Sequence, residues 1–174
     1  MTSPLDAISG EDARSILFYL SATYPEMTKV ILAKAEELLK DFDCEGIAHE
    51  VSCDLEMLEL EDLWNCSGPS RYGYTSPEDM AVEMFEEALE SFEKQIVQYE
   101  GLGMHEEAKR YCMGVLLGIY LFDHASESEF KDYTPDIPRG HFLWLHEKWK
   151  KRNPSDDAKK DMDDFISRKC PEWA

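Results

Sequence analysis

Apolar residues recur every three or four positions along most of the chain, and they rarely alternate one by one with polar residues. The first pattern is typical of amphipathic helices, whereas alternation is typical of half-buried strands. The sequence therefore predicts an all-α protein with about six or seven helices. The helices are expected near residues 11–22, 25–42, 47–64, 77–100, 104–124, 139–152 and 154–168, with 47–64 forming either one helix or two.

The clearest prediction is an antiparallel helical hairpin over about 77–100 and 104–124. Ser76 followed by Pro77 and two acidic residues is typical of a helix N-terminus. The sequence "GLG" separates the two helices, and so short a connection makes them antiparallel neighbours. We therefore expect an antiparallel bundle built around this hairpin.

The second helix of the hairpin contains the longest apolar stretch without a charge, residues 111–122. These 12 residues are fewer than the ~20 that a membrane-spanning helix needs, so we expect them to be buried in the bundle. Gly114 and Gly118 lie four residues apart here, and each costs about 1 kcal/mol in a helix relative to alanine. The expected compensation is the close approach of another helix.

Charge is distributed unevenly along a chain whose 174 residues suit one ordinary domain. The net charge of −19 comprises −21 over residues 1–138 and +2 over residues 139–174. We expect an acidic helical core over 1–138 and a C-terminal helical extension over 139–174 that packs on this core. Because nucleic-acid affinity depends on Lys and Arg, direct binding to nucleic acid or to an anionic membrane is not expected.

The cysteines point to a reducing compartment. The chain has five, an odd number, and none are spaced as CxxC. Its first residues, "MTSPLDAISGEDAR", lack the basic start and apolar run of a signal peptide. A cytoplasmic protein is expected.

Recognisable catalytic and metal-binding motifs do not occur in the sequence. The five histidines form no HExxH pattern, and the cysteines do not have zinc-finger spacing. There is no GxSxG nucleophile motif and no GxxxxGK[ST] phosphate-binding loop. We therefore expect no metal and no cofactor, and the balance of the sequence is against an enzyme.

One candidate binding surface lies in the loop predicted at 65–79. Arg71, Tyr72 and Tyr74 combine a guanidinium group with two amphipathic rings. Loops often carry binding residues, and Tyr and Arg are enriched at interfaces. This loop is the first exposed region that we expect to contact a partner.

A second candidate binding surface lies on the helix predicted at 139–152. His141, Trp144 and Lys148 share one side of this helix, whereas Phe142 and its apolar neighbours share another. One side is expected to dock on the core and the other to stay available for a partner.

These observations favour a cytoplasmic helical module for protein interaction or regulation, without evident catalytic activity. Its partner would be another protein or a second copy of the chain in a homodimer. One alternative is a small all-α enzyme with a pocket assembled near residues 65–75. A second alternative is an acidic decoy that binds a basic, nucleic-acid-binding protein.

Overall fold

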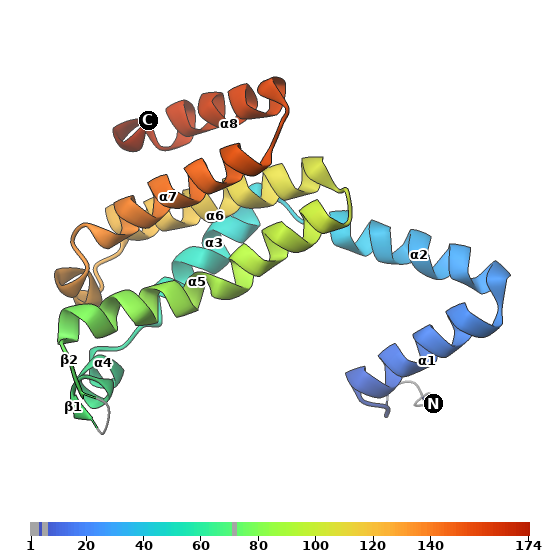
Figure 1. Cartoon of the computed structure of the whole chain (residues 1–174), viewed down its shortest axis with the longest axis horizontal. Coiled ribbons are helices and arrows are strands. Elements are labelled where there is room, and N and C mark those ends of the chain that lie inside the picture. Colours follow the sequence, from blue (N-terminus) through green and yellow to red (C-terminus); the bar gives the residue numbers. More distant parts are fainter. Residues whose placement is uncertain (1–3, 5–6, 71–72) are drawn as a thin grey trace. The chain divides into compact units, whose positions relative to one another are not determined.

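The protein is an all-α helical bundle with one very small sheet (Figure 1). The computed structural model describes every residue except 1–3, 5–6 and 71–72. The described α-helices are α1 (Gly10–Thr23), α2 (Pro25–Lys40), α3 (Cys44–Glu56), α4 (Leu60–Cys66), α5 (Pro77–Gly101), α6 (His105–Ala125), α7 (Ile137–Arg152) and α8 (Asp156–Lys169). Two short strands, β1 (Gly68–Ser70) and β2 (Gly73–Thr75), and two 3-10 helices, η2 (Glu129–Tyr133) and η3 (Pro171–Trp173), complete the described structure.

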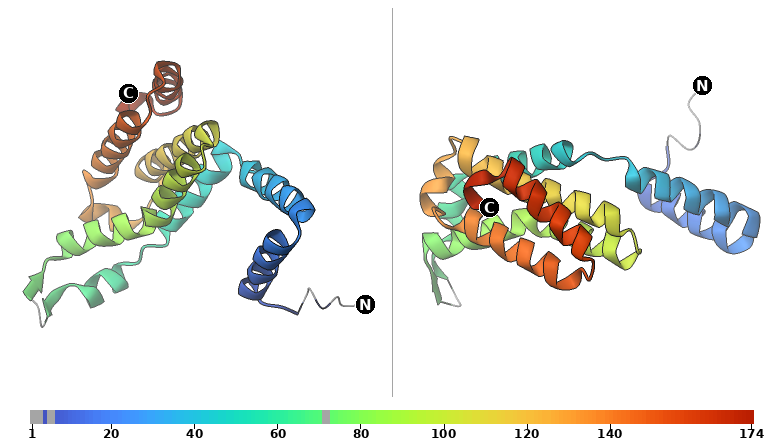
Figure 2. Two further views of the ribbon diagram at one scale, coloured as in Figure 1. Left: turned by 45° about the vertical axis from the view of Figure 1, so that its right-hand side comes forward. Right: turned by 90° about the horizontal axis from the view of Figure 1, so that it is seen from above.

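The chain divides into two compact units, Met1–Phe42 and Asp43–Ala174. The expected division into a core over 1–138 and an extension over 139–174 stays a prediction. The C-terminal region belongs to the larger unit because α7 and α8 supply part of its core. Their fully buried residues include Phe142 and Trp149 of α7 and Met162 of α8. In this unit α6 has α3, α5, α7 and α8 packed around it (Figure 2).

The predicted helical hairpin is confirmed as α5 and α6. The Ser76 hydroxyl accepts a hydrogen bond from the Asp79 backbone N–H at 3.0 Å, and Pro77 occupies the first helical turn. The uncharged stretch lies within α6, where all residues from 112 to 120 are buried. A helix that is apolar nearly all round is one surrounded by neighbours, as the bundle shows.

The two glycines of α6 allow α3 to approach it closely. A Cβ atom placed on Gly118 would lie 2.6 Å from Cβ of Val51 and 2.7 Å from the carbonyl oxygen of Ala48. A Cβ atom placed on Gly114 would lie 2.7 Å from Cβ of Ile47. The expected close approach of another helix is therefore confirmed, and α3 is that helix.

The region predicted at 47–64 forms two helices, α3 and α4. After α4, where an irregular loop was expected, β1 and β2 pair in antiparallel fashion with Gly68 opposite Thr75. Gly68 and Gly73 have φ angles of 104° and 138°, which glycine adopts without a steric penalty. Strands of three residues are too short to produce a recognisable alternating pattern, so the sequence did not reveal them.

The smaller unit is a hairpin of α1 and α2. Across its turn, the Thr28 hydroxyl donates a hydrogen bond to the Ser21 carbonyl at 2.7 Å. Within this unit, neither α1 nor α2 has a buried residue.

None of the described helices combines the length and the apolar character that crossing a membrane requires.

Candidate functional site

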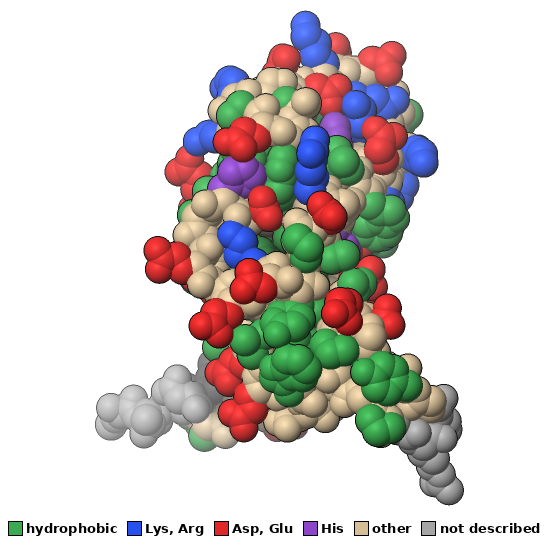
Figure 3. Space-filling model, turned by 90° about the vertical axis from the view of Figure 1, so that its left-hand side faces the viewer, with side chains coloured by type: hydrophobic (Ala, Val, Ile, Leu, Met, Phe, Trp, Pro, Cys, Tyr) green, Lys and Arg blue, Asp and Glu red, His purple; other side chains and the backbone are tan. Residues whose placement is uncertain are grey.

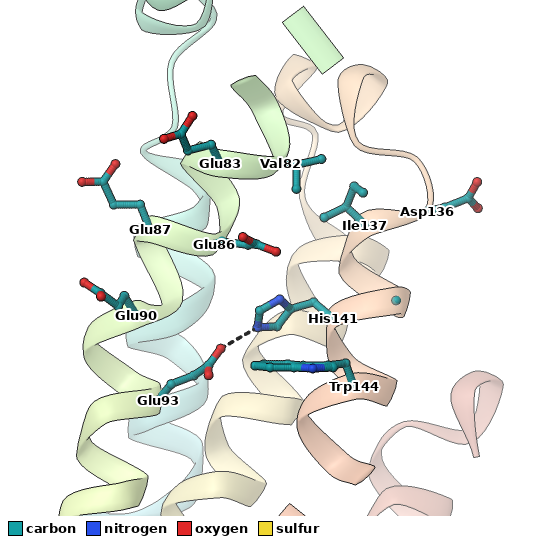
Figure 4. Close-up of a pocket in the computed structure, with 11 residues that line it drawn as sticks. Val82, Glu83, Glu86, Glu87, Glu90, Glu93, Asp136, Ile137, His141 and Trp144 are labelled. Atoms are coloured by element: carbon teal, nitrogen blue, oxygen red, sulfur yellow. Dashed lines mark hydrogen bonds and ion pairs between the residues drawn. The ribbon is translucent and has the colours of Figure 1, made fainter. Parts of the chain in front are cut away.

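A groove of about 770 Å³ runs between α5 and α7 (Figure 4). That volume is within the range typical of ligand-binding clefts. One bank is acidic and belongs to α5, and the other is largely apolar and aromatic and belongs to α7. The lining residues are Val82, Glu83, Glu86, Glu87, Glu90 and Glu93 from α5, then Asp136, Ile137, Gly140, His141 and Trp144.

The acidic bank follows from the helical period of α5. Its buried side is an apolar stripe, and the glutamates recur at three- and four-residue spacing on another side. Glu86 and Glu93 point towards α7, while Glu83, Glu87 and Glu90 line the outer edge (Figure 4). Glu90 is paired with Lys94 at 2.7 Å.

Three of these carboxylates have no counter-charge. Within the described part of the chain, Glu83, Glu86 and Glu87 form no ion pair and are exposed. They lie within five residues of one another on one helix, so their fields add. The groove therefore carries a concentrated negative potential along one bank.

Glu93 has a different role from its neighbours. Its carboxylate accepts hydrogen bonds from Nε2 of His141 at 2.8 Å and from Nζ of Lys148 at 3.0 Å. Burial alone would raise the pKa of Glu93, but these hydrogen bonds outweigh it and lower the pKa below its ordinary value. Glu93 is thus a neutralised anchor that ties α5 to α7 at one end of the groove.

Aromatic rings form much of the opposite bank. The Trp144 indole is 48% exposed, and its ring centroid lies 5.1 Å from that of His141. Nζ of Lys148 lies 4.0 Å from the Trp144 ring centroid, within the range of a cation–π contact. The rest of this bank is Ile137 and the backbone at Gly140, so an apolar ligand group finds contact surface here.

The structure brings together the three residues predicted on the 139–152 helix. His141 and Trp144 line the groove, and Lys148 contacts both Trp144 and Glu93. The docking side of the helix is equally clear, because Phe142 is fully buried. That these residues bind a partner stays a prediction.

The three residues predicted in the 65–79 loop lie elsewhere. Tyr74 belongs to β2 and is 71% exposed, whereas Arg71 and Tyr72 lie outside the described residues. Figure 3 views the end of the molecule that carries α4 and the two strands, and apolar side chains gather there. Exposed apolar residues of that end include Met57 and Trp64, and the Trp64 ring stands edge-on to Tyr133 at 5.6 Å.

The acidic bank was not predicted from the sequence. One signal was available. His141 and Lys148 are seven residues apart, two helical turns, so both can reach a single carboxylate on a neighbouring helix. Nothing local, however, identified Glu93 as that carboxylate.

The described residues show little other chemistry. They contain no group of three His, Cys, Asp or Glu side chains that could hold a metal ion. Burial raises the pKa of Cys44 to about 11 and that of Cys170 to about 12, and the pKa of fully buried Cys112 is raised as well. These three thiols stay protonated near neutral pH and are poor nucleophiles.

Near the C-terminus, His124 lies 3.5 Å from Asp123 and 3.2 Å from Glu172. Its ring also stacks on Tyr120, with centroids 3.9 Å apart, and meets Trp173 edge-on. These contacts fix η3 against α6, which gives the histidine a structural role.

Comparisons of this chain with protein-family models, with curated proteins and with solved structures found no match.

Proposed function

We propose that the protein is a cytoplasmic protein-interaction module that binds a basic segment of a partner protein in the groove between α5 and α7. The observation that supports this most strongly is the set Glu83, Glu86 and Glu87, which forms no ion pair among the described residues and lines a groove opposite an apolar and aromatic bank, with Glu86 pointing towards that bank.

A lysine or arginine side chain matches both banks. Its aliphatic stem is apolar and its head is cationic, so the stem of one side chain can lie on Trp144 or Ile137 while its head lies towards the carboxylates of the acidic bank. An arginine also offers a planar fork that binds a carboxylate through two hydrogen bonds. A segment with two or three basic residues would satisfy the row of carboxylates.

The same features disfavour other ligands at this site. Phosphate groups and acidic peptides would be repelled by the acidic bank. Glu93 and His141 are hydrogen-bonded to each other, and their side chains are only 17% and 8% exposed, so little of either group is open to direct contact with a substrate. Binding rather than catalysis is what this geometry supports.

The strength of binding should depend on salt. Each exposed ion pair contributes about 0.2–1 kcal/mol, so three pairs contribute about 0.6–3 kcal/mol, and added salt screens them. Affinity from the apolar bank is not screened in this way.

The test is fluorescence polarisation with labelled peptides that contain alternating Arg or Lys and apolar residues, at low and high salt. The triple variant Glu83→Gln, Glu86→Gln, Glu87→Gln should bind about tenfold more weakly, which corresponds to about 1.4 kcal/mol. The matched control is Glu56→Gln, Glu61→Gln, Glu127→Gln, which removes the same charge from exposed glutamates outside the groove.

The control variant should bind the peptide as the wild type does. Equal weakening of both triple variants would mean that net charge, not the groove, attracts the peptide. The decoy alternative makes a distinct prediction, because nucleic acid would then compete with this protein for its basic partner. The enzyme alternative near residues 65–75 stays a prediction as well.

A further inference from the structure

The apolar bank of the groove has an arrangement of residues that a second helix can pack against. On α7 this bank consists of Ile137, Gly140, His141 and Trp144. These residues occupy positions i, i+3, i+4 and i+7 of one helix, so they enclose a single patch of its surface. In knobs-into-holes packing, a side chain of a second helix inserts into a hole formed by four residues of the facing helix.

Gly140 leaves the middle of this hole open. It is exposed, and a Cβ atom placed on it would meet nothing within 4 Å. Ile137 and Trp144 stand about one turn away on either side, so the glycine forms a notch between two larger side chains. In α6, the glycines Gly114 and Gly118 allow the close approach of α3. Gly140 offers the same kind of surface to a helix that enters the groove.

The acidic bank repeats this spacing on α5. Its exposed carboxylates belong to Glu83, Glu86, Glu87 and Glu90, which again occupy positions i, i+3, i+4 and i+7. Successive members of such a row are about 5 Å apart along the helix. On one face of an extended strand, side chains recur about every 7 Å, so a strand loses register with both banks, whereas a helix keeps it.

We propose that the basic segment binds as an amphipathic helix, with one of its apolar side chains inserted into the hole over Gly140. This inference rests on the proposed function of the groove. Lysine or arginine side chains on a neighbouring stripe of the bound helix then face the carboxylates of α5. Two stripes that lie one sequence position apart are separated by about 100° around a helix, which suits contact with two neighbouring helices. The partner is therefore recognised by pairs of one apolar and one basic residue that recur every three or four positions.

Two labelled peptides of identical composition test the helical pattern. In the first, leucine–arginine pairs recur every three or four residues, and in the second the same leucines and arginines alternate one by one. Fluorescence polarisation should show about tenfold tighter binding of the first peptide, because only it buries a leucine in the hole. Circular dichroism should show that this peptide gains helix content when it binds. Equal affinity for the two peptides, or tighter binding of the alternating one, would overturn the proposal.

Filling the hole tests the role of Gly140. The variant Gly140→Leu should bind the helical peptide about tenfold more weakly, because the new side chain occupies the place of the inserted leucine. The matched control is Gly101→Leu. Gly101 is the last residue of α5, is exposed, would also have no neighbour within 4 Å of a Cβ atom, and does not line the groove. The control should bind as the wild type does, and thermal melts should show that both variants are folded.

A third peptide separates the hole from a general loss of binding. It has alanine in place of the central leucine of the helical peptide, and the wild type should bind it about tenfold more weakly. Gly140→Leu should bind the alanine and leucine peptides equally. Wild-type affinity of Gly140→Leu for the leucine peptide would overturn the proposal. The glutamate triple variant tests the groove itself: if it weakens binding of both peptide patterns equally, the groove stands and only the helical inference fails.

Discussion

The contact between α3 and α6 gives a sharp prediction about Gly118. Replacing it with alanine adds one methyl group at a place where its carbon would lie 2.6 Å from Cβ of Val51 and 2.7 Å from the backbone oxygen of Ala48. Favourable contacts between carbon atoms lie at about 3.5–4.0 Å, so α3 must move away by about 1 Å. The obstruction is partly backbone, which cannot turn aside as a flexible side chain can.

Two opposing effects decide the magnitude. Alanine is better than glycine in a helix by about 1 kcal/mol, whereas overpacking a dense core costs about 1–3 kcal/mol. Because Ala48 and Val51 are both buried, the cost should lie in the upper half of that range. We expect Gly118→Ala to lower the free energy of unfolding by about 1–2 kcal/mol, and Gly118→Leu to lower it further.

Gly140 is the matched control for this substitution. It also lies inside a helix, α7, but a Cβ atom there would meet nothing within 4 Å. Gly140→Ala should therefore raise the free energy of unfolding by up to about 1 kcal/mol, through helix propensity alone. The same chemical change is thus expected to have opposite signs at two positions.

Urea titration followed by circular dichroism measures both variants, and thermal melts provide a second readout. A change of 1 kcal/mol shifts the melting temperature by about 2–4 °C in a chain of this size. A Gly118→Ala variant as stable as Gly140→Ala would refute the inference that α3 presses on this glycine.

Two further predictions concern charged groups at helix contacts. Because the pKa of Glu93 is lowered in the fold, its stabilising effect is present above its ordinary value of 4.5 and is lost as the pH falls through the lowered value. Glu93→Gln should therefore lower the free energy of unfolding at pH 7 by about 1–2 kcal/mol. Below about pH 4.5, the free energy of unfolding of this variant should fall less with decreasing pH than that of the wild type, and urea titrations at several pH values measure both effects. Lys109, whose side chain is 9% exposed, bridges Glu106 at 2.8 Å and Asp161 of α8 at 2.9 Å. Lys109→Met keeps an apolar stem in place and should lower the free energy of unfolding by less than about 1 kcal/mol. Lys109→Ala leaves a cavity and should lower it by about 2–3 kcal/mol. Equal losses for the two variants would show that the charge of Lys109 matters more than the packing of its stem.

The sequence predicts those features that depend on neighbouring residues. The bounds of α5 and α6 follow from the serine, proline and glycine signals at their ends, and the burial of α6 follows from its uncharged stretch. The glycine pair even indicates close packing by a helix. All of these features are local, because the period of a helix and the signals at its ends depend on residues that lie close together in the sequence.

Pairing between distant residues escapes such reasoning. Glu93 is hydrogen-bonded to His141 and Lys148, which lie 48 and 55 residues away in the sequence. The periodicity of α5 does not indicate either of these partners. Periodicity shows which face of a helix is apolar, but it does not show what covers that face. For this reason the groove was not predicted.

The two uncharged stretches make that limit concrete. Residues 15–25 and 111–122 have nearly the same length and polarity, and both demand burial on physical grounds. For the second stretch, α3, α5, α7 and α8 supply the cover from the same unit, whereas no residue of the first stretch is buried within the hairpin of α1 and α2. The pattern of a sequence thus shows that a face is apolar, but the residues that cover it lie far away along the chain, as His141 and Lys148 do from Glu93.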